Sequence, residues 1–163
     1  SYFIEAARLV LQKTNKVRFV MAGTGDLTRK MLKYVANIGI SDRFHFTGFL
    51  NPFEVRRLFK ITDLYVMPSV SEPFGITPLE AILNGVPVIL SKQSGVSEIL
   101  KYAIKIDFWD THALADAIYN VINNTELHKT MQKMQMEEVN QVTWDKSCKK
   151  LLNIYYQLLQ ARA

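Results

Sequence analysis

The stretch Ser69–Leu90, SVSEPFGITPLEAILNGVPVIL, holds the pattern of a turn, a helix, a second turn and a strand. Pro78 suits the first turn of a helix, and Gly85 suits the position just after a helix ends. Val86–Leu90 is apolar throughout, which is typical of a strand buried on both faces in a parallel sheet. The stretch therefore predicts a fold in which strands and helices alternate.

The same alternation extends along most of the chain. Four further short apolar runs predict strands at Val17–Met21, Phe44–Thr47, Leu64–Met67 and Ala103–Ile106. Amphipathic stretches predict helices between them, at Leu27–Asn37, Pro52–Ile61, Pro78–Leu83 and Val96–Leu100. The pattern predicts the α/β class, with a doubly wound, Rossmann-like parallel sheet flanked by helices.

Both ends of the chain read as helices. The opening SYFIEAARLVLQK is amphipathic, and residues 111–163 predict a helical C-terminal segment with helices at His112–Asn123, Glu126–Gln141 and Trp144–Gln160. In the last helix, Trp144, Cys148 and Leu151 share an apolar face that we expect to be buried. With 163 residues, the chain fits a single domain, residues 1–163.

Composition excludes several classes of protein. Cys148 is the only cysteine, which rules out a disulfide framework and a cysteine metal site and favours a cytoplasmic location. No apolar run approaches the ~18 residues of a membrane span. The net charge of +5 suits an anionic ligand or peripheral docking on a membrane, although an ordinary solvated surface is the simpler reading. The basic residues form no stripe of the kind that binds nucleic acid.

Five of the seven glycines follow predicted strands: Gly23, Gly25, Gly48, Gly75 and Gly95. They should therefore gather beyond the carboxyl ends of the strands, where open α/β sheets bind ligands. Each could also simply make a tight turn. Their clustering at one edge favours a ligand site for the set.

The loop Ala22–Asp26, AGTGD, begins like the dinucleotide fingerprint G-x-G-x-x-G. Thr28 replaces its third glycine, and no acidic residue ends the second strand to hold a ribose, so a nicotinamide site is disfavoured. No phosphate-binding G-x-x-x-x-G-K-[ST] motif occurs either. A loop lining a pocket for a phosphate or a sugar fits better.

Two glutamates flank the Pro-Phe-Gly turn of the opening stretch. Thr77-Pro-Leu-Glu80 has the form of a capping box with Thr77 as the N-cap, which would occupy Glu80 structurally, as in Asn51-Pro-Phe-Glu54. Capping does not account for Glu72. The N–H groups at the start of a helix suit an anion such as a diphosphate, and carboxylates accept hydrogen bonds from sugar hydroxyls.

The pattern Glu72-PFGITPL-Glu80 followed by Gly85-Val-Pro-Val resembles the signature of retaining, nucleotide-sugar-dependent glycosyltransferases of the GT-B fold, called group 1 or family four. Further stretches match in the same order. They are Val20-Met-Ala-Gly-Thr-Gly25, Arg43-Phe-His-Phe-Thr-Gly48, Asp63-Leu-Tyr-Val-Met-Pro-Ser69, Ser94-Gly95-Val-Ser-Glu98 and Thr143-Trp144. The resemblance implies one half of a GT-B enzyme, the donor-binding domain. The N-terminal acceptor domain, and an Arg…Lys pair expected just ahead of the first helix, are not in this sequence.

The resemblance implies a role for each matching residue. Glu80 would hold the ribose, and Glu72 would contact the donor sugar as the catalytic-site acid. The amides expected to bind the diphosphate belong to Phe74, Gly75, Ile76 and Thr77. The backbone expected beside the base belongs to Gly48 and Phe49, and that beside the phosphates to Gly23 and Gly25. The resemblance implies no cofactor and no obligatory metal, and His45, His112 and His128 show no metal-ligand spacing.

We therefore expect a fragment of an enzyme that transfers a sugar from a nucleotide diphosphate sugar to an acceptor with retention, and little activity from this domain alone. A non-catalytic nucleotide-sugar binding module or a regulatory module is the alternative. An epimerase of the same architecture is disfavoured, because such enzymes lack the turn that carries Glu72.

Overall fold

The computed structural model describes residues 1–160. Its elements are, in order, α1 (Tyr2–Lys13), β1 (Phe19–Ala22), α2 (Thr28–Asn37), β2 (Phe44–Gly48), α3 (Pro52–Phe59), β3 (Tyr65–Met67), α4 (Thr77–Leu83), β4 (Val88–Ser91), a 3-10 turn (Gly95–Glu98), β5 (Ile104–Ile106), α5 (Thr111–Asn123), α6 (Thr125–Val139) and α7 (Trp144–Gln160). The expected α/β class, with parallel strands between helices, is confirmed.

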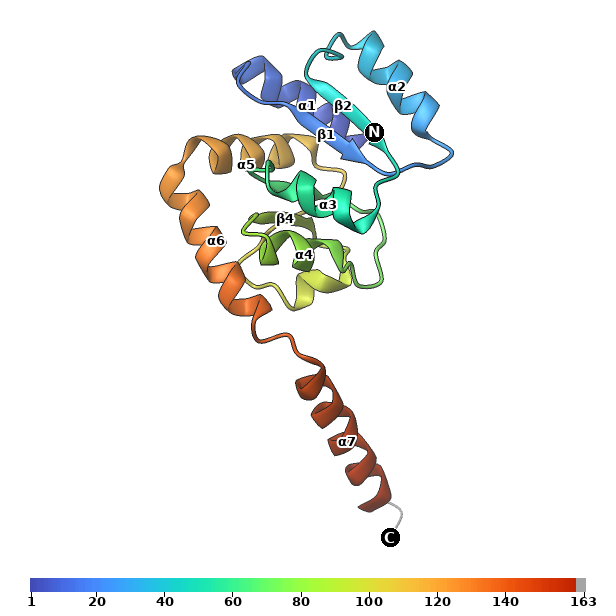
Figure 1. Cartoon of the computed structure of the whole chain (residues 1–163), viewed down its shortest axis with the longest axis vertical. Helices are drawn as coiled ribbons and strands as arrows, with labels where there is room; N and C mark the ends of the chain where they lie inside the picture. Colours follow the sequence, from blue (N-terminus) through green and yellow to red (C-terminus); the bar gives the residue numbers. More distant parts are fainter. Residues whose placement is uncertain (161–163) are drawn as a thin grey trace.

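The strands form two hydrogen-bonded groups in place of one continuous sheet. β1 pairs with β2, and β3, β4 and β5 pair in that order, always in parallel. Phe19 lies opposite Phe44 in the first group, and Tyr65 lies opposite Val88 in the second. Figure 1 shows β1 and β2 above, with β4 and the helices around it below.

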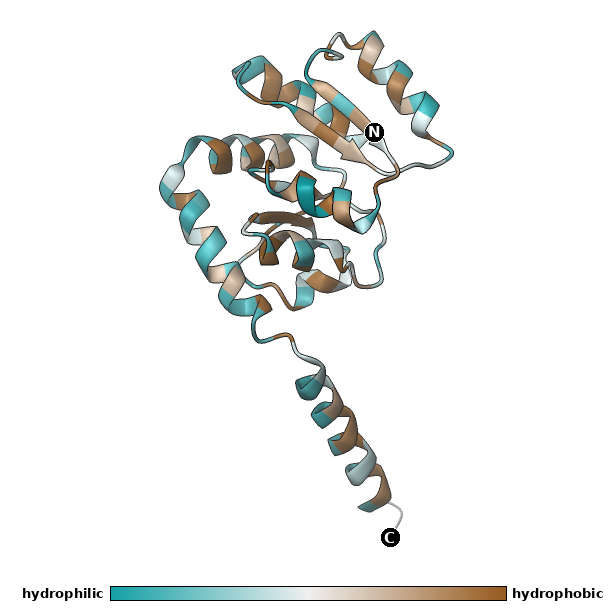
Figure 2. Cartoon of the chain, viewed as in Figure 1, coloured by the Kyte–Doolittle hydropathy of each residue, from teal (hydrophilic) through white to brown (hydrophobic). Residues whose placement is uncertain are grey.

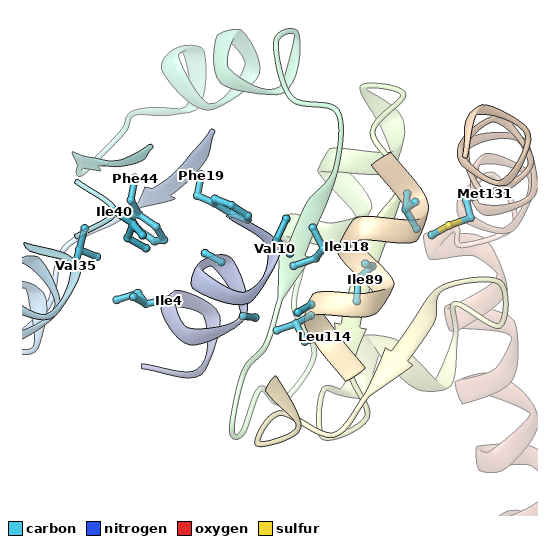
Figure 3. Packing of buried hydrophobic residues seen from close by; sticks show 14 residues of the cluster. Ile4, Val10, Phe19, Val35, Ile40, Phe44, Ile89, Leu114, Ile118 and Met131 are labelled. Carbon is cyan, nitrogen blue, oxygen red and sulfur yellow. The ribbon is translucent and has the colours of Figure 1, made fainter. Parts of the chain in front are cut away.

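Helices α1 and α5 join the two groups. Figure 3 shows one continuous cluster that begins at Phe19 and Phe44, passes through Val10 of α1 and Ile118 of α5, and reaches Ile89 of β4. An ion pair between Lys13 and Asp116, 2.5 Å long, links the same helices at the surface. Packing of apolar side chains, which removes their surface from water, is therefore the main connection between the two strand groups.

A second apolar cluster covers the other face of β3 and β4. It combines Phe59 of α3 and Ile82 of α4 with Val88 and Leu90 of β4 and Val139 of α6. Because consecutive residues of a strand point to opposite faces, Ile89 belongs to the first cluster while Val88 and Leu90 belong to the second. Strands buried on both faces are what the continuous apolar run at this position predicted.

Polar side chains of α6 hold the backbone at the amino ends of β3, β4 and β5. His128 Nε2 lies 2.7 Å from the carbonyl oxygen of Asp63, and Gln132 Nε2 donates to that of Gly85 over 2.6 Å. Gln135, fully buried, accepts from Val88 N at 2.9 Å and donates to Val88 O at 3.2 Å. Glu138 accepts hydrogen bonds from two backbone amides just before β5, Lys101 N at 2.7 Å and Tyr102 N at 3.1 Å. These contacts lie at the amino edge, opposite the loops that carry the expected glycines.

Helix α7 corrects one expectation. The face that carries Trp144, Cys148 and Leu151 was expected to be buried, but no residue of α7 is buried and Cys148 is exposed. Figure 1 shows the helix extending away from the rest of the chain, and Figure 2 shows apolar residues along one of its sides. An apolar stripe shows that a helix is amphipathic, but it does not show that a partner lies against it. None of the helices in residues 1–160 is both long and apolar enough to cross a membrane.

A candidate ligand site at the carboxyl ends of the strands

All five strands are parallel, so the loops that follow them leave from the same edge of their sheets. The five expected glycines lie in these loops or at the strand ends. Gly23, Gly48 and Gly75 have φ angles of 113°, 73° and 90°, which side chains other than glycine rarely adopt. These backbone conformations explain why glycine is needed at these three positions, and they leave open both the ligand site and the simple turn.

The loop after β3 is fixed against the start of the 3-10 turn. Glu72 and Ser94 form a parallel bridge, with Gly95 N donating to Glu72 O at 2.9 Å and Val96 N donating to Phe74 O at 2.7 Å. A Cβ on Gly95 would lie 2.1 Å from the carbonyl oxygen of Pro73, so only glycine fits there. The path of the backbone through Glu72 and Phe74 is thus held by the neighbouring loop.

The amides that follow this turn are free. Among the described residues, no acceptor is found for the N–H groups of Phe74, Gly75, Ile76 and Thr77. The start of α3 differs, because there Asn51 accepts from Phe53 N and Glu54 N, and Glu54 accepts from Asn51 N, completing the expected capping box. The amides at the start of α4 therefore remain available to an anion, at the end of the helix where the dipole is positive.

The expected capping box at Thr77 and Glu80 is wrong. Ile76 occupies the N-cap position, with helical φ and ψ of −76° and −34°, and no side chain caps α4. Thr77 is then the first helical residue, and it lacks the extended backbone that an N-cap side chain needs to reach back to the amides. The Glu80 side chain is exposed and is not used by the helix start.

The phenol of Tyr65 lies within electrostatic range of both glutamates, Glu72 and Glu80. Burial raises the pKa of the Tyr65 phenol to about 12, Thr77 beside it acts in the opposite direction, and the carboxylates of Glu72 and Glu80 raise it further. Both acids therefore lie close enough to the phenol to act on its charge. Sequence reasoning missed Tyr65. Its signal is the alternation along β3, which places it on the same face as Met67, toward α4.

The remaining expected residues lie over the other strand group. Gly23 N donates to Gly48 O at 2.8 Å, which joins the ends of β1 and β2, and Phe49 is 76% exposed just beyond them. Gly25 N donates to Thr28 Oγ1 at 3.1 Å in the following loop. A groove of about 1100 Å³ runs between the two strand groups, and Ala22, Pro68 and Thr77 are among its lining residues.

The acids after β5, Asp107 and Asp110, make structural contacts. Asp107 pairs with Lys92 at 2.7 Å and accepts from Gln93 at 3.2 Å, and these two contacts lower the pKa of its carboxyl group. Asp110 caps α5 by accepting from Ala113 N at 2.9 Å. Within residues 1–160, no three side chains of the metal-binding types converge on one point.

Comparison with known proteins identifies the relatives of this chain. The family model for glycosyl transferases group 1 matches residues 1–137. An uncharacterised glycosyltransferase of Methanocaldococcus jannaschii is 30% identical over 159 residues, which are 94% of this chain and 40% of that protein. The chain thus spans well under half of this relative.

Solved structures show the same fold. TarM of S. aureus superposes with a TM-score of 0.83 at 23% identity, over 94% of this chain and 31% of TarM. HepE of Anabaena, solved in complex with UDP-glucose, superposes with a TM-score of 0.75 at 24% identity, over 85% of this chain and 40% of HepE. The fold is that of part of a GT-B glycosyltransferase, and the chain belongs to the glycosyl transferases group 1 family.

Proposed function

We propose that this chain is the donor-binding part of a glycosyltransferase that moves a sugar from a nucleotide diphosphate sugar to an acceptor with retention of anomeric configuration. The observation that carries the proposal is the run of free amides from Phe74 to Thr77, with Glu72 before it and Glu80 just after it. Hydrogen-bond donors between two acids match a ligand in which a diphosphate joins two hydroxyl-bearing sugars. HepE, a solved relative in fold, binds UDP-glucose.

In this proposal the amides of Phe74–Thr77 stabilise the negative charge of the diphosphate. Negative charge grows on the diphosphate as the bond to the sugar breaks, and N–H groups already held in place stabilise that charge without reorganising. The bridge between Glu72 and Ser94 keeps these donors in position. Glu72 orients the donor sugar and Glu80 holds the ribose. Gly48 and Phe49 border the base, and Gly23 and Gly25 border the phosphates.

The rest of the activity belongs to the longer protein. This chain spans 40% of the M. jannaschii relative. The proposal assigns the acceptor site to an N-terminal domain outside this chain. We expect the 163-residue chain to bind donor weakly and to transfer little sugar by itself. The proposal needs no metal, places the whole protein in the cytoplasm, and allows peripheral membrane docking through the net charge of +5.

Calorimetric titration with UDP and with UDP-glucose tests the two acids separately. Glu80→Gln should weaken binding of both ligands about tenfold or more, which corresponds to ~1.4 kcal/mol, because both contain the ribose. Glu72→Gln should weaken only UDP-glucose, because only that ligand carries the sugar. Glu137→Gln, on the exposed side of α6, is the matched control and should change neither. Unchanged binding of UDP-glucose to both site variants would contradict the proposal.

A measurement of turnover distinguishes an enzyme from a binding module. The whole protein, supplied with donor and a range of acceptors, should release the nucleoside diphosphate, and Glu72→Gln should slow that release. The non-catalytic module would be supported instead if the whole protein bound the donor tightly but released no nucleoside diphosphate, even by slow hydrolysis of the donor.

A further inference from the structure

Three aromatic rings form a cluster after β5, at the same edge of the sheet as the candidate ligand site. The ring centres of Tyr2 and Phe108 are 5.4 Å apart, and those of Phe108 and Trp109 are 4.7 Å apart, both in edge-to-face contacts. Such contacts are a favourable arrangement for pairs of aromatic rings. Phe108 is half-buried, whereas Trp109 is 55% exposed. The cluster therefore holds the indole ring in place and leaves more than half of Trp109 open to solvent.

The turn that carries Trp109 is fixed by its own hydrogen bonds. Asp110 N donates to Asp107 O at 2.9 Å, and Thr111 N donates to Trp109 O at 3.0 Å. The carboxylate of Asp110 accepts from Ala113 N at 2.9 Å, which joins the turn to the start of α5. An aromatic side chain on a fixed turn loses little conformational freedom when a ligand binds to it. Trp109 is therefore presented to solvent in a form that is ready to bind.

Contacts between loops connect this turn to the loop of Glu72. Lys92 and Gln93, in the loop after β4, both contact the carboxylate of Asp107, at 2.7 Å and 3.2 Å. The same loop continues into Ser94, which forms the parallel bridge with Glu72. Because β3, β4 and β5 are neighbours in this order, the loops that follow them lie side by side along one edge. Neighbouring strands are about 4.8 Å apart, so β5 lies roughly 10 Å from β3 across the sheet.

The groups around the exposed indole are polar. The side chain of Lys92 is 54% exposed and that of Asp107 is 31% exposed, and Asp110 and His112 are exposed as well. Another protein surface that covered Trp109 would remove these charges from water, which costs free energy unless each finds a partner. A sugar ring has an apolar face of C–H groups and a rim of hydroxyl groups, which suits an aromatic ring beside carboxylates. The surroundings therefore favour a sugar over an apolar protein surface.

We propose that Trp109 is a stacking platform for an oligosaccharide acceptor that lies along the carboxyl edge of β3, β4 and β5. This proposal rests on the proposed function. The acceptor end that receives the new sugar would lie near Glu72, and a more distant ring of the same acceptor would stack on the indole. A chain of a few linked hexoses spans the roughly 10 Å between β3 and β5. Trp109 does not touch the reacting atoms in this arrangement, so its role is to bind the acceptor and not to catalyse.

Fluorine NMR of the whole protein, labelled with fluorotryptophan, tests the platform. The probes are maltotetraose, cellotetraose and chitotetraose, which differ in linkage and in their N-acetyl groups. The resonance that is absent from the Trp109→Phe variant identifies Trp109. We expect this resonance to shift with at least one tetrasaccharide, while the resonance of Trp144 stays in place. Glucose at the same concentration should cause a smaller shift, because a single ring cannot reach Trp109 and the region of Glu72 together.

Three variants of the whole protein separate stacking from other roles. Trp109→Ala should weaken binding of the tetrasaccharide about tenfold or more, and Trp109→Phe, which keeps an aromatic face, should restore part of the affinity. Trp144→Phe is the matched control and should leave the affinity unchanged. Binding of UDP-glucose, measured on the same samples, should be equal in every variant, because the donor site near Glu72 and Glu80 is intact. A failure of donor binding is thereby distinguished from a failure of the platform.

Any one of three results would overturn the proposal. The Trp109 resonance could stay unshifted with all three tetrasaccharides. Trp109→Ala could bind the tetrasaccharide as tightly as the unchanged protein does. A soluble paramagnetic agent could fail to broaden the Trp109 resonance in the whole protein, which would show that another part of the protein covers the ring.

Discussion

At the scale of single residues, Gly95 carries the geometry of the site loop. An alanine Cβ there would overlap the backbone of Pro73, which no rotamer change can relieve. We expect Gly95→Ala to lower the free energy of unfolding by about 2–3 kcal/mol and to weaken donor binding, because the 72–76 loop must move. Gly25→Ala is the control for stability alone, since nothing lies within 4 Å of its added Cβ. Equal stability of the two variants in urea denaturation would show that the loop is not held in this way.

Tyr65 predicts how stability changes in alkali. Its pKa rises from 10.0 to about 12 on folding, so burial of the neutral phenol stabilises the fold fully below pH 10. That contribution is lost as the pH rises through 10 toward 12, because the unfolded chain then ionises first. Tyr65 should ionise late in an absorbance titration, as should Tyr34, whose pKa is raised by its hydrogen bond to Glu5, and Tyr65→Phe should remove only the step that belongs to Tyr65. A Tyr65→Phe variant that keeps both late steps would place them on other tyrosines.

Prediction from sequence worked unevenly at this scale. Glu72 was singled out as unexplained by capping, and the capping box weighed as the structural alternative for Glu80 does not form. The difference between Asn51 and Thr77 is one of backbone, because Ile76 is already helical and the helix starts one position early. Tyr65 was missed, since an aromatic residue in a strand usually signals core packing, and only folding brings it near both acids.

At the scale of elements, α6 fastens the amino ends of the strands through Gln135. Replacing it by methionine of similar size would leave Val88 N and Val88 O buried without these partners. We expect Gln135→Met to cost about 2–3 kcal/mol of unfolding free energy, measured by thermal or urea denaturation. Lys133→Met, on the exposed side of the same helix, should change it by less than ~0.5 kcal/mol. A neutral Gln135→Met would mean that water replaces the side chain.

The boundaries of the elements follow closely from the sequence, but their partners do not. Apolar periodicity located the strands and the α-helices, from α1 through α7, within a few residues, but the helix expected at Val96–Leu100 is a 3-10 turn at Gly95–Glu98. It could not report that β1 and β3 leave a space between them, because pairing depends on which edges meet. Nor could it report that the apolar face of α7, including Cys148, is exposed. Both are properties of contacts between elements distant in sequence.

At the scale of the whole molecule, the two strand groups should behave as separate cooperative units. They are joined through the packing of α1 on α5, without a shared strand ladder. The proposed ligand site draws residues from both, with Gly23 and Gly48 over one group and Phe74–Thr77 over the other. A ligand that contacts both groups must therefore stabilise both.

Native-state hydrogen exchange can measure this coupling in the 163-residue chain. Without ligand, Met21 in β1 should exchange through an opening of lower free energy than Leu90 in β4, because Leu90 lies between two paired strands and Met21 does not. With UDP-glucose at ~100 times its Kd, both openings should become costlier by up to ~2.7 kcal/mol, because opening either group releases the ligand. The Glu80→Gln variant, which binds less, should show a smaller increase at both positions. If only Leu90 responds, the ligand touches the second group alone, and the assignments of Gly23, Gly25, Gly48 and Phe49 are wrong.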